Sequence, residues 1–125
     1  MVINEIYLYD LFPDGGGTPD MSEAWFMLLN ATVTGKIGRI EIVDSEFNEI
    51  QTIISSAKAK RYNKDSRNLS GNMMLFEIID KDGVVHRMYT SYESGFFDID
   101  GNIFYSIDNK DHKQWIKQFR EKYKK

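Results

Sequence analysis

His86 and His112 are the only histidines in the 125-residue chain, and so they are the first candidates for chemistry near neutral pH. Two histidines are enough for phosphodiester cleavage, one as general base and one as general acid, with a cation such as Arg87 on the developing charge. However, His86 shares the apolar face of its predicted strand with Phe76, and His112 begins the apolar stripe of a predicted helix. This placement favours partly buried histidines, so we assign no catalytic residue and keep this pair as the last alternative.

Two Asp-x-Asp-Gly segments, Asp80–Gly83 and Asp98–Gly101, carry a second pattern, because closely spaced acids before a glycine are typical of calcium loops. With either glycine at the sixth position of such a loop, the two positions that require an acid hold other residues, namely Phe96 and Ile107, or Ile78 and Tyr89. Both segments instead fit three-residue hairpin loops whose glycine takes a positive φ. We therefore expect neither a metal site nor a cofactor.

The remaining motifs that could carry chemistry are incomplete. The glycine-rich loop at Gly15–Gly17 lacks the Gly-Lys-Ser/Thr ending of a phosphate-binding loop, and no Gly-x-Ser-x-Gly elbow is present. The chain has no cysteine, which excludes a disulfide scaffold, a thiolate zinc site and a cysteine nucleophile. We read the glycine-rich loop as a connector.

The elements that must position these residues follow from hydrophobic periodicity. Apolar residues at spacings of three and four predict amphipathic helices over about residues 45–61 and 109–124. Apolar or alternating segments predict strands over residues 3–11, 24–34, 37–43, 73–79, 84–89, 96–97 and 103–107. This order predicts an α+β fold, a meandering antiparallel sheet of about six or seven strands with both helices packed on one face. No composition break divides the chain, so we expect one globular domain over 1–125.

The first hairpin also has a predicted register. If Asp80 pairs with Val84 across a three-residue loop, Glu77 lies opposite Arg87, which is a favourable cross-strand pair. A two-residue loop would place Glu77 opposite Met88. The charge pairing therefore favours the longer loop.

Composition narrows the class of protein. The chain is 42% hydrophobic with a formal charge of -3, and no apolar run reaches the ~18 residues of a membrane span. Acids near the N-terminus are unlike a secretory signal, so we expect a cytoplasmic protein without a membrane partner. Basic clusters at residues 58–67 and 110–125, with nearby aromatic residues, could suit nucleic acid. The acidic remainder of the chain argues against that partner.

The aromatic content of 14% exceeds what a small two-layer core obviously needs, so some rings are expected on a partner surface. We place that surface on the sheet face away from the helices, where Leu75, Ile79 and Val85 would otherwise be uncovered. If the acids of both hairpin tips lie on the same edge of the sheet, they would form its negatively charged rim. The predicted binding residues are Tyr89, Tyr92, Glu93, Asp98, Asp100 and Trp115.

The predicted function is a non-catalytic domain that binds another protein or itself. Small, acidic, cysteine-free domains of this kind are similar in general character to the immunity proteins that neutralise bacterial toxins, and that similarity implies an acidic surface covering a basic active site. The first alternative is a small-ligand pocket between the sheet and the C-terminal helix, lined by Trp115, Phe119 and His86. The second alternative is the two-histidine phosphodiesterase or nuclease.

Overall fold

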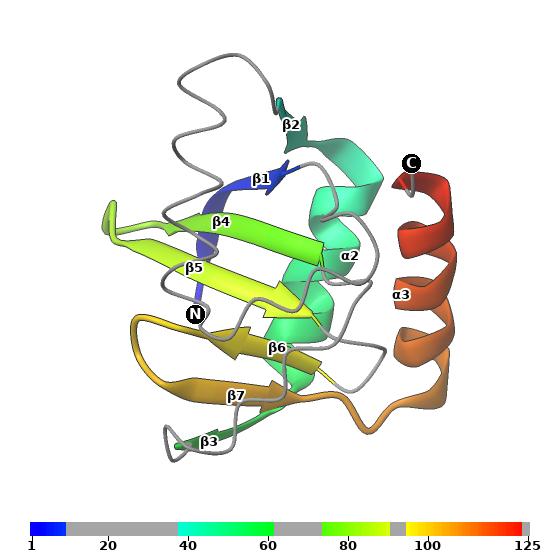
Figure 1. Ribbon diagram of the computed structural model, residues 1–125. Helices are drawn as coiled ribbons and strands as arrows, with labels where there is room; N and C mark the ends of the chain where they lie inside the picture. The colour runs from blue at the N-terminus through cyan, green and yellow to red at the C-terminus, as the bar shows by residue number, and fades with distance from the viewer. Residues whose placement is uncertain (10–37, 62–73, 91–94, 124–125) are drawn as a thin grey trace, which may run out of the picture.

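The computed structural model describes residues 1–9, 38–61, 74–90 and 95–123 (Figure 1). The predicted strand over residues 24–34, the loop at Gly15–Gly17, and the predicted binding residues Tyr92 and Glu93 lie outside these ranges. The described elements are β1 (Ile3–Tyr9), β2 (Arg39–Ile42), α2 (Asp44–Ser56), β3 (Lys58–Arg61), β4 (Met74–Asp80), β5 (Val85–Thr90), β6 (Gly95–Asp98), β7 (Ile103–Ser106) and α3 (Lys110–Tyr123).

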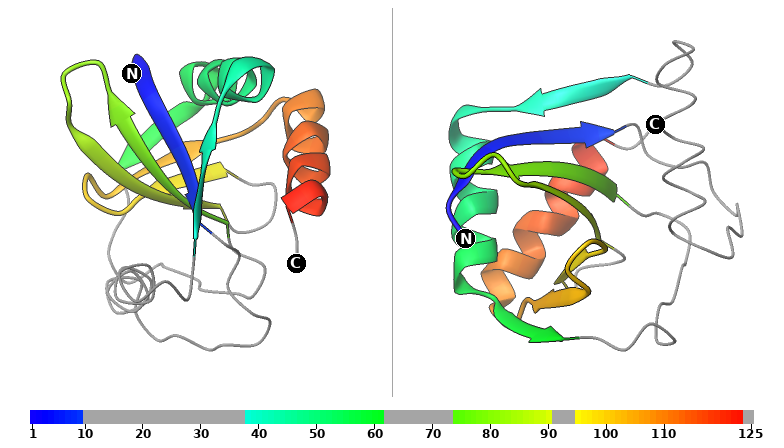
Figure 2. Two further views of the ribbon diagram at one scale, coloured as in Figure 1. Left: turned by 90° about the horizontal axis from the view of Figure 1, so that it is seen from above. Right: turned by 90° about the vertical axis from the view of Figure 1, so that its left-hand side faces the viewer.

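The seven strands form one sheet in the order β2-β1-β4-β5-β6-β7-β3, and every neighbouring pair is antiparallel. Strands β4 to β7 form the meander, and β2 and β3 form the two edges. Helix α2 connects those edges by running from one side of the sheet to the other (Figure 2). The predicted α+β class and antiparallel sheet are confirmed.

The first helix ends earlier than expected. Helix α2 stops at Ser56, and residues 58–61, predicted as its last turn, form strand β3 and pair with β7. The sequence Lys-Ala-Lys-Arg consists of good helix formers without period-two alternation, so intrinsic preference pointed to helix. Backbone pairing with β7 overrides that preference, since all four side chains of β3 are exposed and contribute no apolar face.

Both helices pack their apolar residues into one core. Ile50, Ile53 and Ile54 of α2 and Ile116 and Phe119 of α3 are buried there. They meet one set of alternating sheet positions, which places both helices on the same face of the sheet; these positions are Ile6, Leu8, Ile42, Met74, Phe76, Ile78, Met88 and Phe96. None of the helices in the described ranges is long and apolar enough to cross a membrane.

The helix starts differ in how they are capped. At α3, Asn109 Oδ1 accepts hydrogen bonds from the backbone N–H of Asp111 at 2.8 Å and of His112 at 3.1 Å. At α2, the cap position is Val43, which provides no side-chain hydrogen bond. Asp44 has a positive φ of 57°.

The sheet face away from the helices is not left uncovered in its centre. Leu75, Tyr89 and Phe97 lie side by side across β4, β5 and β6, and they are exposed by 0%, 5% and 4%. Toward the β4–β5 hairpin the face is open, since Val85 is 46% exposed there. Tyr89, which was predicted to lie on an aromatic surface at this place, is therefore a buried residue.

Candidate functional site

The first hairpin tip has the predicted three-residue loop. The Asp80 N–H donates to the Val84 carbonyl at 3.0 Å, and Glu77 lies opposite Arg87. Gly83 has a φ of 81°, as predicted for this loop. Asp80 Oδ1 accepts the N–H groups of Asp82 at 2.9 Å and Val84 at 3.0 Å, so this oxygen holds the turn.

In the second tip, an aspartate oxygen also accepts two backbone N–H groups, but the loop is longer. Asp98 Oδ1 accepts the N–H groups of Asp100 and Gly101, both at 3.0 Å, and Asp98 pairs with Ile103 across four residues. The positive φ is at Asn102 and not at Gly101, which corrects the expected three-residue loop. Gly101 instead lets Asp98 Oδ2 lie close to the backbone, because a Cβ at position 101 would lie 3.2 Å from that oxygen.

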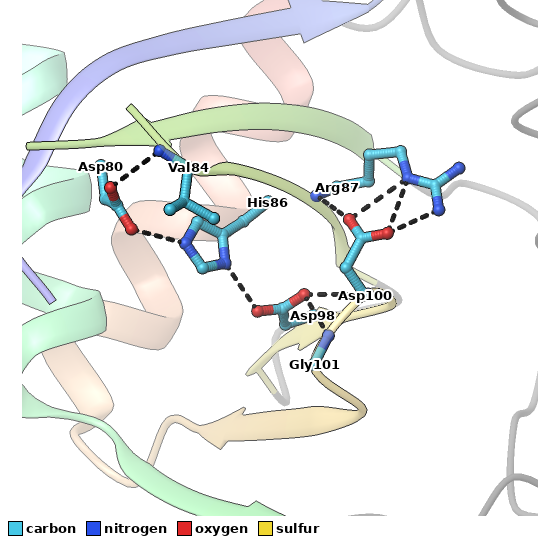
Figure 3. A network of polar contacts seen from close by, with 7 residues as sticks. All are labelled: Asp80, Val84, His86, Arg87, Asp98, Asp100 and Gly101. Carbon is cyan, nitrogen blue, oxygen red and sulfur yellow. Dashed lines mark hydrogen bonds and ion pairs between the residues drawn. The ribbon is translucent and has the colours of Figure 1, made fainter. Parts of the chain in front are cut away.

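His86 joins the two tips. Its Nε2 lies 2.9 Å from Asp80 Oδ2, and its Nδ1 lies 2.9 Å from Asp98 Oδ2 (Figure 3). Each aspartate thus uses one oxygen for its own turn and the other oxygen for the same imidazole. Both hairpin loops lie at the same end of the sheet (Figure 1). The Asp80–His86–Asp98 group, called the imidazole bridge below, connects hairpin β4–β5 to hairpin β6–β7.

The imidazole bridge favours the charged forms of His86 and Asp80. Burial alone would lower the pKa of His86, but the hydrogen bonds and charges of Asp80 and Asp98 raise it above the ordinary 6.5. The hydrogen bond from His86 lowers the pKa of Asp80 below its ordinary value. Since carboxylate oxygens only accept, an imidazolium with two N–H donors satisfies both contacts.

A second ion pair fastens the same tips beside the bridge. The Arg87 guanidinium donates to Asp100 at 2.6 to 3.2 Å, and the Arg87 backbone N–H donates to Asp100 Oδ2 at 2.9 Å. Burial alone would raise the pKa of Asp100, but the Arg87 contacts lower it. Arg87 is therefore engaged with Asp100 and is not directed at a reaction centre formed by His86.

The geometry gives the bridge a structural role. In a catalytic carboxylate–histidine pair, one ring nitrogen is oriented by the carboxylate and the other faces the substrate. Here Asp80 occupies that second nitrogen, so a proton transfer would first have to break the Asp80 contact. Within the described residues, no group of three or more His, Asp or Glu side chains could hold a metal ion.

His112 lies at a different place, in an open pocket of about 410 Å³ between the end of α2, the end of β7 and the start of α3. The structure does not bring His86 into this pocket, so the two candidate histidines do not form one site. Lys58 and Asp108 form an ion pair of 3.6 Å beside it. The lining residues are Ile53, Ser56, Ala57, Lys58, Ser106, Ile107, Asp108, Asn109 and His112.

The four predicted binding residues that the structure describes, Tyr89, Asp98, Asp100 and Trp115, do not form one exposed surface. Asp98 is 1% exposed and Tyr89 is 5% exposed, so neither belongs to an acidic and aromatic rim. Asp100 is exposed but pairs with Arg87. Trp115 is half-buried, where it stacks on Phe119 at 5.1 Å between ring centroids, and both also line a small hollow with Glu46.

The two sheet edges are the surfaces that sequence reasoning missed. The β3 edge shows three cations, Lys58, Lys60 and Arg61, all exposed. The β2 edge shows Ile40, which is 41% exposed although it lies opposite the buried Leu8 of β1. The alternation of apolar and charged residues in Arg39–Ile42 was visible in the sequence, but its position at an edge depends on the strand order.

Comparison with protein-family models, with curated protein sequences and with solved structures found no match. Function must therefore be argued from the site, because a fold of this class by itself accommodates many functions. The imidazole bridge, the His112 pocket and the two edges are the features that a functional proposal can use.

Proposed function

We propose that the chain is a non-catalytic protein-binding domain that receives a strand of its partner at the β2 edge. The observation that carries this proposal is the exposure of Ile40 at a place where the sheet could continue. Leu8, its neighbour on β1, is 1% exposed, whereas Ile40 is 41% exposed. Within the described residues, the apolar layer therefore ends at β2, and a strand added there would extend it.

Edge-strand binding suits such a surface for two reasons. An added strand gains backbone hydrogen bonds along the edge, and alternate side chains give specificity. Val43, directly after β2, is 51% exposed and adds apolar area to the same edge. Among the described residues, this edge combines an open strand with exposed apolar side chains.

The contacts of the two histidines also support a non-catalytic function. His86 makes two carboxylate contacts within the fold, and His112 lies in a separate pocket, so the described residues support a structural role for His86 over the two-histidine mechanism. An immunity-type role is one form of the proposed function, in which the partner is a toxin. For such a role we propose the β2 edge, and not the acidic tips, as the binding surface, because Asp98 is buried and Asp100 is paired with Arg87.

Site-specific cross-linking tests the proposal. A photoreactive benzoylphenylalanine at position 40 is expected to form protein adducts in producing cells, whereas the same group at position 85, where Val85 is similarly exposed at 46%, is not. The partner identified from the adduct should bind the purified chain, and Ile40→Lys should weaken that binding at least about tenfold while Val85→Lys does not. Equal adducts at both positions, or full binding by Ile40→Lys, would contradict the proposal.

A second candidate function rests on the His112 pocket. Its volume of about 410 Å³ falls in the range of small-molecule sites, and the hydroxyls of Ser56 and Ser106 and the imidazole of His112 offer polar contacts. We expect a small polar ligand if this pocket is used. Ligand-detected NMR with a library of such molecules tests it: binding that His112→Ala and Ser106→Ala each weaken supports the pocket, and no saturable binding contradicts it.

A further inference from the structure

We infer that the partner at the β2 edge is a second copy of this chain, paired antiparallel about a two-fold axis at Ile40. This inference rests on the proposed function and names its partner. In such a pair, Ile40 lies opposite Ile40 of the second copy, and Arg39 and Glu41 lie opposite each other in both directions. Closed two-fold pairing is the commonest form of self-association among soluble proteins.

The side chains of β2 match themselves in this register. Arg39 and Glu41 lie on the face away from the helices, beside Tyr9 and Tyr7, whereas Ile40 lies on the core face beside Leu8. The two-fold pairing therefore sets an isoleucine against an isoleucine on one face and two opposite charges on the other. A shift by one residue would set Arg39 against Ile42 and Ile40 against Glu41, which removes both matches.

The charges needed for this pairing are accessible. Glu41 is exposed and makes no ion pair with any residue of the described ranges. Arg39 lies over the Tyr7 ring at 4.2 Å and contacts Glu77 at 3.4 Å, yet 44% of its side chain remains exposed. Its guanidinium has five N–H donors, so it can bind Glu41 of the second copy while it keeps Glu77.

The other sheet edge provides the contrast. In β3, pairing with a second copy about Ala59 would oppose Lys58 and Lys60, and pairing about Lys60 would oppose two lysines. Exposed lysines on an edge strand are a common protection against such pairing. β2 has no lysine and exposes an isoleucine, so of these two edges it is the one whose sequence accepts a copy.

The expected dimer is weak. β2 is only four residues long, so the described contact falls below the roughly 1,200 Å² of a standard stable interface. We therefore expect association that depends on concentration, with a dissociation constant in about the micromolar range or above. Measurements must accordingly cover a wide range of protein concentrations.

Sedimentation equilibrium of four proteins tests the inference. The wild type is expected to approach dimer mass with rising concentration. Glu41→Arg alone sets two arginines against each other across the axis, and Arg39→Glu alone sets two glutamates against each other, so each variant should associate at least about tenfold more weakly. An equimolar mixture of the two variants places the doubly basic strand of one against the doubly acidic strand of the other and should recover the dimer. Val85→Lys, on a similarly exposed apolar residue outside β2, should behave as the wild type.

Several outcomes would overturn the inference. It fails if the wild type stays monomeric at the highest concentration reached, if Glu41→Arg associates as strongly as the wild type, or if the mixture stays monomeric. Circular dichroism verifies folding, and Glu41→Arg, which breaks no ion pair of the described residues, decides even if Arg39→Glu does not fold. A monomeric wild type that still binds a different protein at position 40 would refute the dimer and leave the proposed function standing.

Discussion

His86 Nδ1 lies 2.9 Å from Asp98 Oδ2, although Asp98 is 1% exposed and stands on a different hairpin. An aspartate so deeply buried requires a partner for its charge. Asp98 has one on each oxygen, the backbone N–H groups of its own loop and the imidazole of His86. Asp98 is therefore an internal connection of the fold and is not one of its exposed acids.

Removal of the imidazole should be more destabilising than a surface substitution. We expect His86→Ala to lower the free energy of unfolding by roughly 2–3 kcal/mol, because it leaves the buried Asp98 carboxylate without its side-chain partner. His112→Ala, the matched control, should change it by less than about 0.5 kcal/mol. Urea denaturation of both variants measures the difference, and equal effects would argue against the bridge.

The imidazole bridge predicts a pH window for stability. The pKa of His86 is raised, so its contribution is fully present below 6.5 and is lost as the pH rises through the folded-state pKa. The pKa of Asp80 is lowered, so its contribution is present above 3.8 and is lost as the pH falls through its folded-state value. Urea midpoints from about pH 3 to about pH 9 should show a maximum between these limits.

The loss of stability at alkaline pH can be tested separately with a His86 variant. His86→Ala should flatten the decline above about pH 6.5, since the group that releases its proton is gone. NMR titration of the His86 ring should also give a pKa above 6.5. A His86 pKa below its ordinary value, or an unchanged alkaline decline in the variant, would show that the bridge is not formed in solution.

The boundary between α2 and β3 can be tested by disulfide formation. Lys58 faces Ser106 across the β3–β7 pair, and the chain has no cysteine of its own. Lys58→Cys/Ser106→Cys should oxidise to an intramolecular disulfide, because paired strand positions have suitable Cα separations. Lys60→Cys/Ser106→Cys, two positions out of register, should oxidise much more slowly. Faster oxidation of the Lys60→Cys/Ser106→Cys pair would contradict the pairing of β3 with β7.

The α3 cap can be measured against its neighbour. Asn109→Ala should cost about 1 kcal/mol of stability, because Asn109 Oδ1 accepts two N–H groups in the first turn of the helix. Asp108→Ala removes only an exposed ion pair with Lys58 and should cost less than about 0.5 kcal/mol. A larger loss of stability for Asp108→Ala than for Asn109→Ala would contradict Asn109 as the cap of the helix.

The sequence predicted local features well where one interaction decides them. The pairing of Glu77 with Arg87 followed from charge and loop length, and the two helices followed from apolar spacing. β3 could not be found this way, because it pairs with β7, which lies far along the chain, and because its side chains carry no strand pattern.

The imidazole bridge depends on two registers at once. His86 reaches Asp80 within its own hairpin, but it reaches Asp98 only because β5 pairs with β6 in a register that sets Met88 opposite Asp98. The sequence showed the two similar aspartate turns and a histidine between them. It did not show that both turns lie on one side of the sheet, which is a property of the strand order.

Hydrogen exchange at the two sheet edges is the most direct test of strand pairing by a second copy. Backbone amides of β2 (Arg39–Ile42) should exchange more slowly at high protein concentration than at low concentration, because pairing protects an edge strand. Amides of β3 (Lys58–Arg61) should exchange at the same rate in both samples. Exchange in β2 that does not depend on concentration, or protection that appears in β3 instead, would contradict the proposed interface.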